Sequence, residues 1–214
     1  YPFSHTLPSG QTAWYRPGEW DLAALTWPDA SGNGHTATLS GPGLESVQAS
    51  GQVTALRGTT SSRFSFGTVR ILTPSYTVCS ATRYTGSTNK RILQGSDINW
   101  LHGHWNGFSG VAYYKGWKTS YTANTVSIPV GFTGWVIMCG TNAGSQASTS
   151  FIANGANVGT GTGGSGNTGL RINSGARPAD ASDFEVAEVI VWPRGLASSE
   201  MWAAYHYLRA NVLG

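Results

Sequence analysis

Short runs of β-forming residues, divided by turn-forming residues, most constrain what this chain can fold into. From Trp14 onward such runs recur about every 8–12 residues, with Gly, Asn, Asp or Pro between them. Examples are "YTVCSATRY", "GWVIMCGT" and "FEVAEVIVW". This spacing favours an antiparallel sandwich or jelly roll over a fold of alternating strands and helices. A chain of 214 residues is long enough for one large all-β domain with its own core.

Charge and hydropathy exclude two classes of partner. Charged residues make up only 11% of the chain, and the basic ones are scattered rather than clustered on one element. A nucleic-acid binder shows a basic patch or stripe, so we expect no nucleic-acid partner. No apolar run approaches the roughly 20 residues of a membrane-spanning helix, so we expect no membrane insertion.

The two ends of the chain differ from its β-rich middle. Residues 1–13 hold two prolines and a P-S-G turn, which predicts an extended N-terminal arm before a single domain over 14–214. Near the C-terminus we predict one short amphipathic helix, with Ser198 as N-cap and Glu200 in its first turn. Its apolar stripe follows the helical period and consists of Met201, Ala204, Tyr205 and Leu208.

The chain has two cysteines, Cys79 and Cys139, each inside a strand-like run. Two strand cysteines in a Gly- and Thr-rich chain with few lysines indicate a disulfide in a secreted protein. Two buried free thiols are the alternative, because free cysteine is a common core residue.

Two stretches resemble a known family. "WPDASGNGHTATLSG", from Trp27 to Gly41, is an Asp- and Gly-rich turn leading into a strand, and "FEVAEVIVWPRGLASSEM" is a strand followed by an acidic helix start. Together they resemble the laminin-G-like branch of the concanavalin A-like lectin/glucanase superfamily, over about Trp14 to Leu208. The resemblance implies two antiparallel sheets packed as a jelly roll, an extracellular setting, and binding to carbohydrate or protein.

The resemblance does not imply catalysis, and the acids argue against it. The glucanases of this superfamily carry an E-x-D-x-x-E strand, which is absent here. Glu185 and Glu188 are three residues apart, so on a regular strand they point to opposite faces. We therefore expect the protein not to be an enzyme.

A polysaccharide lyase is the enzymatic alternative, because such lyases use a His and a Tyr as acid and base. His102 or His104 with Tyr113 or Tyr114 offers that pair, but the accompanying Gln and the R-x-E-x-R strand are missing.

Metal ligands are sparse. The H-x-H of His102 and His104 shares one face of a strand, but a third ligand is not placed by spacing. Asp29, Ser31 and Asn33 alternate in the way that the oxygen-bearing residues of a calcium-binding loop do, yet these residue types are also typical of a turn that binds no metal ion. We expect no cofactor and keep calcium as an option.

The aromatic stretch "NWLHGHWNGFSGVAYYKGW" remains as the candidate binding region and predicts two strands joined by an N-G-F-S-G turn. Trp100, His102 and His104 share one face of the first strand, and Leu101, Gly103 and Trp105 share the other. We take the face that carries the histidines as the exposed one. The predicted ligand-binding residues are Trp100, His102, His104, Asn106, Tyr114 and Trp117.

The leading hypothesis is therefore a non-catalytic, extracellular lectin-like module that binds glycan or a cell-surface glycoprotein. The second is a structural protomer of an extracellular filament, sheath or coat, whose N-terminal arm lies on a neighbouring subunit. Low charge and abundant Tyr, Trp and Arg favour such self-assembly.

Overall fold

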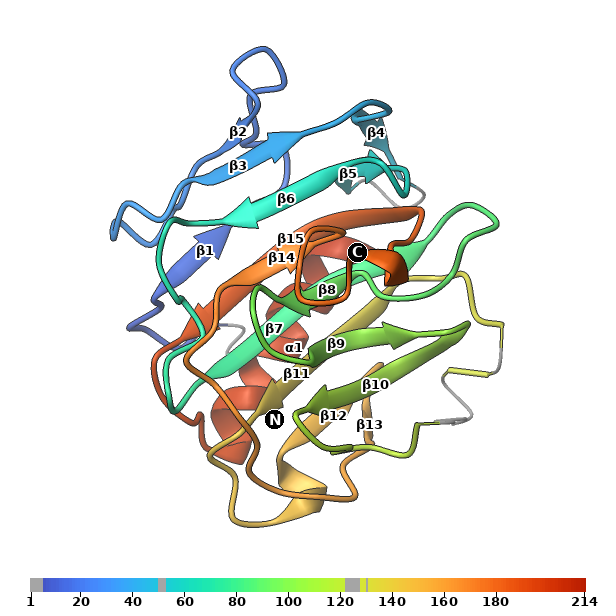
Figure 1. Ribbon diagram of the computed structural model, residues 1–214. Helices are drawn as coiled ribbons and strands as arrows, with labels where there is room; N and C mark the ends of the chain where they lie inside the picture. Colours follow the sequence, from blue (N-terminus) through green and yellow to red (C-terminus); the bar gives the residue numbers. More distant parts are fainter. Residues whose placement is uncertain (1–5, 50–52, 122–127, 130) are drawn as a thin grey trace.

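Two antiparallel sheets lie face to face and make an all-β sandwich (Figure 1). The computed structural model describes residues 6–49, 53–121, 128–129 and 131–214. The larger sheet holds β1 (Ala13–Tyr15), β4 (Glu45–Gln48), β5 (Thr54–Gly58), β7 (Thr77–Tyr84), β11 (Val136–Thr141), β12 (Phe151–Ala153), β13 (Ala156–Asn157) and β15 (Phe184–Trp192). The smaller sheet holds β2 (Thr26–Trp27), β3 (Ala37–Ser40), β6 (Arg63–Phe66), β8 (Leu93–Gly95), β9 (Trp100–Trp105), β10 (Phe108–Tyr114) and β14 (Leu170–Ile172).

The strand order confirms the predicted jelly-roll class. The larger sheet runs β13-β12-β11-β7-β15-β5-β4, with β1 beside the second half of β15, and the smaller runs β10-β9-β8-β14-β6-β3-β2. Neighbours in both sheets come from distant parts of the chain, as in a concanavalin A-like sandwich. Two 3-10 turns, η1 (Ala147–Thr149) and η2 (Pro178–Asp180), and one helix, α1 (Ser198–Leu213), complete the described elements.

Large side chains fill the space between the sheets. Trp27 packs edge-on against Phe64, and Phe64 in turn against Phe184 of the other sheet, with ring centroids 6.4 and 5.3 Å apart. All three rings are fully buried. Such contacts between inward-facing aromatic residues supply much of the burial that holds a sandwich together.

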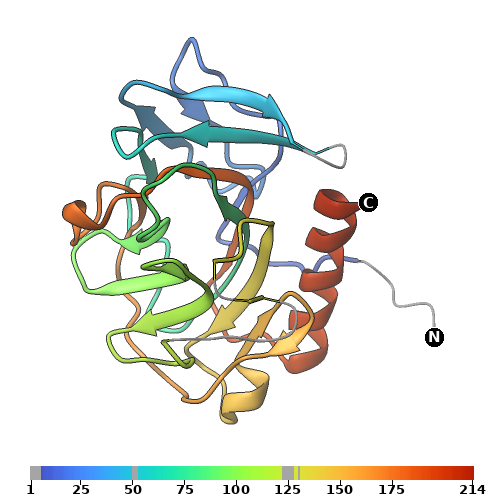
Figure 2. The ribbon, with the colours of Figure 1, turned by 90° about the vertical axis from the view of Figure 1, so that its right-hand side faces the viewer.

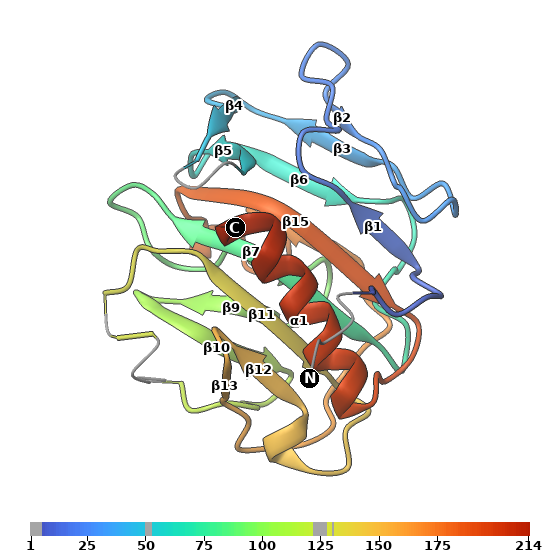
Figure 3. The same ribbon diagram turned by 180° about the vertical axis from the view of Figure 1, so that it is seen from behind.

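Helix α1 covers the outer face of the larger sheet, so that the sandwich has a third layer there (Figures 2 and 3). The predicted apolar stripe is confirmed, since Met201, Ala204, Tyr205 and Leu208 are buried against the sheet. The predicted N-cap is wrong by one residue. Ala197 precedes the helix, and the Glu200 carboxylate accepts the Ala197 N–H at 2.9 Å. Within the described ranges, no helix combines the length and apolarity needed to cross a membrane.

A β-bulge in β15 changes which side chains face the helix. The register against β7 shifts between Val186 and Glu188, so Ala187 is the extra residue. As a result Glu185 and Glu188 both lie on the outer face of the larger sheet. The expectation that they point to opposite faces is therefore wrong, because it assumed a regular strand.

The described part of the predicted N-terminal arm lies on its own domain. Leu7 packs against the apolar cluster beneath the helix, and the Pro8 carbonyl accepts the indole N–H of Trp192 at 3.0 Å. The backbone N–H of Thr12 donates to the Val191 carbonyl at 2.7 Å. Residues 7–12 thus extend the contacts of β1 along β15, while residues 1–5 of the predicted arm lie outside the described residues.

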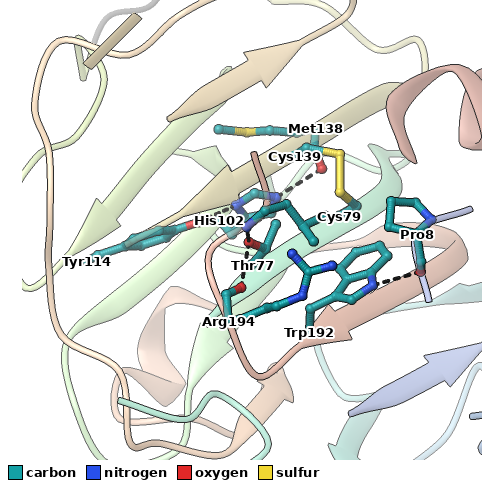
Figure 4. Close-up of a disulfide and its surroundings, with 10 residues drawn as sticks. Pro8, Thr77, Cys79, His102, Tyr114, Met138, Cys139, Trp192 and Arg194 are labelled. Atoms are coloured by element: carbon teal, nitrogen blue, oxygen red, sulfur yellow. Dashed lines mark hydrogen bonds between the residues drawn. A yellow bond between two sulfur atoms is a disulfide. The ribbon is translucent and has the colours of Figure 1, made fainter. Parts of the chain in front are cut away.

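A disulfide joins Cys79 and Cys139, as the sequence predicted (Figure 4). The two residues are direct partners in the pairing of β7 with β11, with Cα atoms 4.1 Å apart. The bridge closes a loop with a sequence separation of 60, which includes the whole of β8, β9 and β10. It therefore links two adjacent strands in the middle of the larger sheet and anchors both ends of the segment that carries these three strands of the smaller sheet.

Replacing both cysteines, in Cys79→Ala/Cys139→Ala, should lower the free energy of unfolding by about 4 kcal/mol. Loop-closure entropy gives that magnitude for a loop of this length. Urea denaturation of the double variant and of the oxidised and reduced wild type measures it. Equal midpoints for the oxidised and reduced protein would contradict the prediction.

Candidate functional site

The face predicted to meet a ligand lies inside the sandwich. Trp100, His102, His104 and Tyr114 are fully buried, so the expectation that they form an exposed binding face is wrong. The division of β9 into two faces is correct, but its orientation is the reverse of the expected one. Of the predicted residues, only Asn106, exposed in the turn between β9 and β10, and the half-buried Trp117 reach solvent.

His102 joins the two sheets. Its Nε2 lies 3.2 Å from the carbonyl oxygen of Met138 in β11, and its Nδ1 lies 2.8 Å from the hydroxyl of Tyr114 (Figure 4). Because a carbonyl only accepts, Nε2 carries the proton and Nδ1 accepts from Tyr114. The His–Tyr pair that a lyase would need therefore exists, but it lies in the core and serves to connect β9, β10 and β11.

His104 is also buried, but fewer hydrogen bonds compensate for its burial than for that of His102. Its Nδ1 lies 3.4 Å from the Thr82 hydroxyl, and its ring packs edge-on against Tyr84 with centroids 4.5 Å apart. Its Nε2 has no hydrogen-bond partner among the described residues. Burial lowers the pKa of His102 to about 4, and burial together with His102 lowers that of His104 to about 3. The H-x-H pair is thus a neutral core pair, and the described ranges hold no group of three or more His, Cys, Asp or Glu that could bind a metal ion.

The calcium candidates form a hydrogen-bonded turn. Asp29 accepts the backbone N–H groups of Trp14, Ser31 and His35 at 2.9 to 3.0 Å, and the Ser31 hydroxyl at 2.8 Å. Burial raises the pKa of Asp29, but these hydrogen bonds outweigh it and lower the pKa overall. The side-chain amide of Asn33 donates to the carbonyls of Gln11 and Thr12. Asp29 and Asn33 therefore fix the start of β1.

The opposite face of β9 and β10 carries partly exposed aromatic side chains. They pack on the buried residues Leu101 and Val111, on the outer side of the smaller sheet. We call this the aromatic surface; its members are Trp105, Phe108 and Tyr113, together with Trp117 and Tyr121 from the segment after β10, of which Tyr121 joins through its contact with Trp117. These rings contact one another. The ring centroids of Trp117 and Tyr113 are 5.3 Å apart with an interplanar angle of 81°, and those of Trp117 and Tyr121 are 5.6 Å apart. Sequence reasoning included Trp117 and missed the rest.

A buried arginine borders this surface. The Arg91 guanidinium lies over the Trp105 ring, 4.7 Å from its centroid, and contacts Asp180 at 3.0 Å and Asn99 at 2.7 Å. Burial lowers the pKa of Arg91, and Asp180 opposes that shift. Nearby on β8, the Gln94 side-chain carbonyl accepts the Arg177 N–H, while its amide nitrogen has no partner among the described residues. Rings, a fixed guanidinium and an amide are the groups that bind sugars.

Comparisons with known proteins agree with the fold. No protein-family model and no curated protein sequence matches the chain. Trypanosoma rangeli sialidase in complex with the inhibitor DANA is similar over 98% of this chain and 34% of its own, at TM-score 0.60 and 14% identity. Domain 4 of AbnA, a GH43 extracellular arabinanase from Geobacillus stearothermophilus, in complex with arabinotriose, is similar over 90% of this chain and 97% of its own, at TM-score 0.53 and 15% identity.

A third similar structure is the binding domain of botulinum neurotoxin DC in complex with SialylT. It matches 93% of this chain and 52% of its own, at TM-score 0.55 and 10% identity. At identities of 10% to 15%, these likenesses establish the β-sandwich fold alone.

These findings contradict the expectation that the protein is not an enzyme. Sialidases and a GH43 arabinanase are glycoside hydrolases, so the fold occurs within catalytic proteins. This chain spans 34% of the sialidase chain. What the comparisons share is a β-sandwich in proteins that act on or bind glycans.

Lowering the pH from 7 to 5 should destabilise the fold through His102 and His104. Their pKa values of about 4 and about 3 lie below the ordinary value of 6.5 that applies to the unfolded chain. Between pH 7 and pH 5 the unfolded chain binds protons at these two histidines that the folded chain does not bind. The contribution of the two histidines to the free energy of unfolding is therefore complete above about pH 6.5. It decreases as the pH falls, by about 4 kcal/mol for the pair. Urea denaturation at both pH values measures it.

The matched variant is His104→Leu, which removes one titrating ring and its unpartnered nitrogen. It should lose about half of the pH dependence and keep its stability at pH 7. A variant with the full wild-type pH dependence would contradict the assignment.

Proposed function

We propose that this protein is an extracellular glycan-binding module of the laminin-G-like branch, and that the aromatic surface holds the sugar. The observation that carries the proposal is the set of partly exposed rings on β9, on β10 and just after β10, four of which pack on buried Leu101 and Val111. Contiguous exposed apolar groups on a soluble domain mark interaction sites. The comparisons support the ligand class, since two of the similar structures are complexes with arabinotriose and with SialylT.

The chemistry of the surface suits a sugar. The C–H faces of a pyranose or furanose ring pack against aromatic rings, while its hydroxyl groups need donors and acceptors beside them. Trp117, held by Tyr113 and Tyr121, supplies a ring of fixed orientation. Asn106, at a positive φ of 48° in the β9–β10 turn, presents an amide at the edge of this region. Because the rings are already ordered, binding costs little side-chain entropy.

The disulfide supports the extracellular part of the proposal, because such bonds persist in oxidising compartments. The organisation as one domain over 14–214 is part of the same proposal. It agrees with the two sheets, which draw strands from β1 near the start of the chain to β15 near its end.

Trp117→Ala should weaken glycan binding at least tenfold, a loss of about 1.4 kcal/mol, because it removes the central ring of the aromatic surface. A glycan array with the wild type identifies a ligand, and isothermal titration then compares the variants. Trp202→Ala is the control, since Trp202 is a partly buried Trp on α1, beyond the other sheet.

Equal losses in both variants, or a wild type that binds no glycan on a broad array, would overturn the proposal.

A further inference from the structure

A cleft of about 880 Å³ opens at the rim of the larger sheet, where β5 and β7 end and β4 and β15 begin. It lies away from the aromatic surface, which is on the outer side of the smaller sheet. Charged side chains dominate its lining, namely Glu45, Arg57, Arg83, Asp183 and Glu185. No residue of the aromatic surface belongs to this lining.

The charges alternate in one row across four strands. Glu45 of β4 is the direct partner of Arg57 of β5, and Glu185 of β15 is the direct partner of both Arg57 and Arg83 of β7. Partners in adjacent strands share a face and lie close enough to interact. Acidic and basic side chains therefore alternate along the floor of the cleft.

Glu185 fixes both arginines. Its carboxylate is fully buried, and each oxygen has its own guanidinium: Arg57 donates to Oε1 through Nε and Nη2 at 2.9 and 2.7 Å, and Arg83 donates to Oε2 through Nε at 2.6 Å. Arg83 also lies over the Trp135 ring, 4.9 Å from its centroid. Hydrogen bonds to Glu185 raise the pKa of Arg57. Neither guanidinium can swing away without leaving one oxygen of the buried carboxylate without its charged partner.

Donors remain for a ligand after these bonds. A guanidinium carries five N–H groups. Arg57 uses three of them, two on Glu185 and one on Glu45 at 3.0 Å. The side chains of Arg57 and Arg83 are 44% and 19% exposed, so both reach the cleft.

Acceptors stand beside these donors. Asp183 accepts the backbone N–H of Thr60 at 3.1 Å and that of Thr88 at 3.2 Å, which holds the two loops of the rim in place. Gly86 approaches Asp183 so closely that a Cβ there would lie 2.2 Å from its carboxylate oxygen. The hydroxyl groups of Thr85 and Ser87 line the same rim.

We propose that this cleft is a second binding site, and that it takes a neutral sugar unit rather than an acidic one. The lining holds two arginines against three carboxylates, so it offers an anion no net attraction, and a carboxylated sugar would have to compete with Glu185 for its guanidiniums. A neutral sugar matches the mixture, since each hydroxyl group both donates and accepts. The inference shares only the ligand class with the proposed function; its residues and variants are separate.

The test is NMR titration of the ¹⁵N-labelled protein with neutral trisaccharides (arabinotriose, xylotriose and maltotriose) and with acidic trigalacturonate. The side-chain Nε–H signals of Arg57 and Arg83 report on the cleft, and the indole signal of Trp117 reports on the aromatic surface. A neutral trisaccharide should shift both arginine signals and bind there at least tenfold more tightly than trigalacturonate.

Two variants separate the cleft from the rest of the protein. Ser87→Trp places a bulky ring at the exposed rim and should weaken the cleft affinity at least tenfold, while Ser40→Trp, on exposed β3 of the other sheet, should leave it unchanged. Glu45→Gln keeps an acceptor for Arg57 but removes one negative charge. This variant should therefore show a smaller ratio between the affinities for the neutral trisaccharide and for trigalacturonate than the wild type does.

The outcomes distinguish the two proposals. Shifts of the Trp117 indole alone would overturn the cleft site and leave the proposed function standing. Shifts of the arginine signals alone would support the cleft and overturn the role of the aromatic surface. Tighter binding of trigalacturonate at the arginines would overturn the neutral-sugar assignment.

Discussion

Two carboxylates buried on one face of one strand set the conditions for much of this fold. A buried charge without a partner costs several kcal/mol, and both Glu185 and Glu188 of β15 are fully buried on the outer face of the larger sheet. The bulge at Ala187 brings Glu188 to the same side of the sheet as Glu185, the side that faces the helix. Glu185 requires arginines from both neighbouring strands. Glu188 accepts the indole N–H of Trp14 at 2.7 Å and contacts the Asn211 amide at 3.5 Å, while burial raises its pKa.

These partners come from four different elements, so the two acids determine what surrounds the central strand. Glu185 links β5 and β7 to β15, and Glu188 links β1 and the last turns of α1 to it. Slipping any of these elements by one residue would leave a buried charge without its partner. The cleft follows from the same requirement, because the ion pairs that neutralise Glu185 also hold two guanidiniums still at the rim of the sheet. A binding site of fixed donors is thus a consequence of how the fold accommodates a buried acid.

The sequence predicts the elements well and their surroundings poorly. The strand spacing predicts the sandwich, the paired cysteines predict the disulfide, and the helical period predicts the buried stripe of α1. The alternation in "NWLHGHW" also divides β9 correctly. Which side faces out is set by partners far away in the chain: His102 is acceptable in the core because Met138 and Tyr114 satisfy both ring nitrogens. The bulge at Ala187 leaves no mark in a run of strand-forming residues, which is why the relation of Glu185 to Glu188 was predicted wrongly.

The sequence does contain a signal that identifies the outer face of the smaller sheet, but it can be recognised only when the pairing register of the strands is known. Leu101 lies in a row with Gln94, Arg171, Ser65 and Thr38 of successive strands, and these neighbours are polar. A polar row on one face indicates the solvent side, and it places the aromatic surface there rather than on the histidine side. The two outer faces of the sandwich therefore differ in physical character. The smaller sheet offers ordered rings, whose contacts with a sugar depend little on salt. The larger sheet offers, at its rim, fixed charges of nearly balanced sign, which favour a ligand through hydrogen-bond geometry rather than through net attraction.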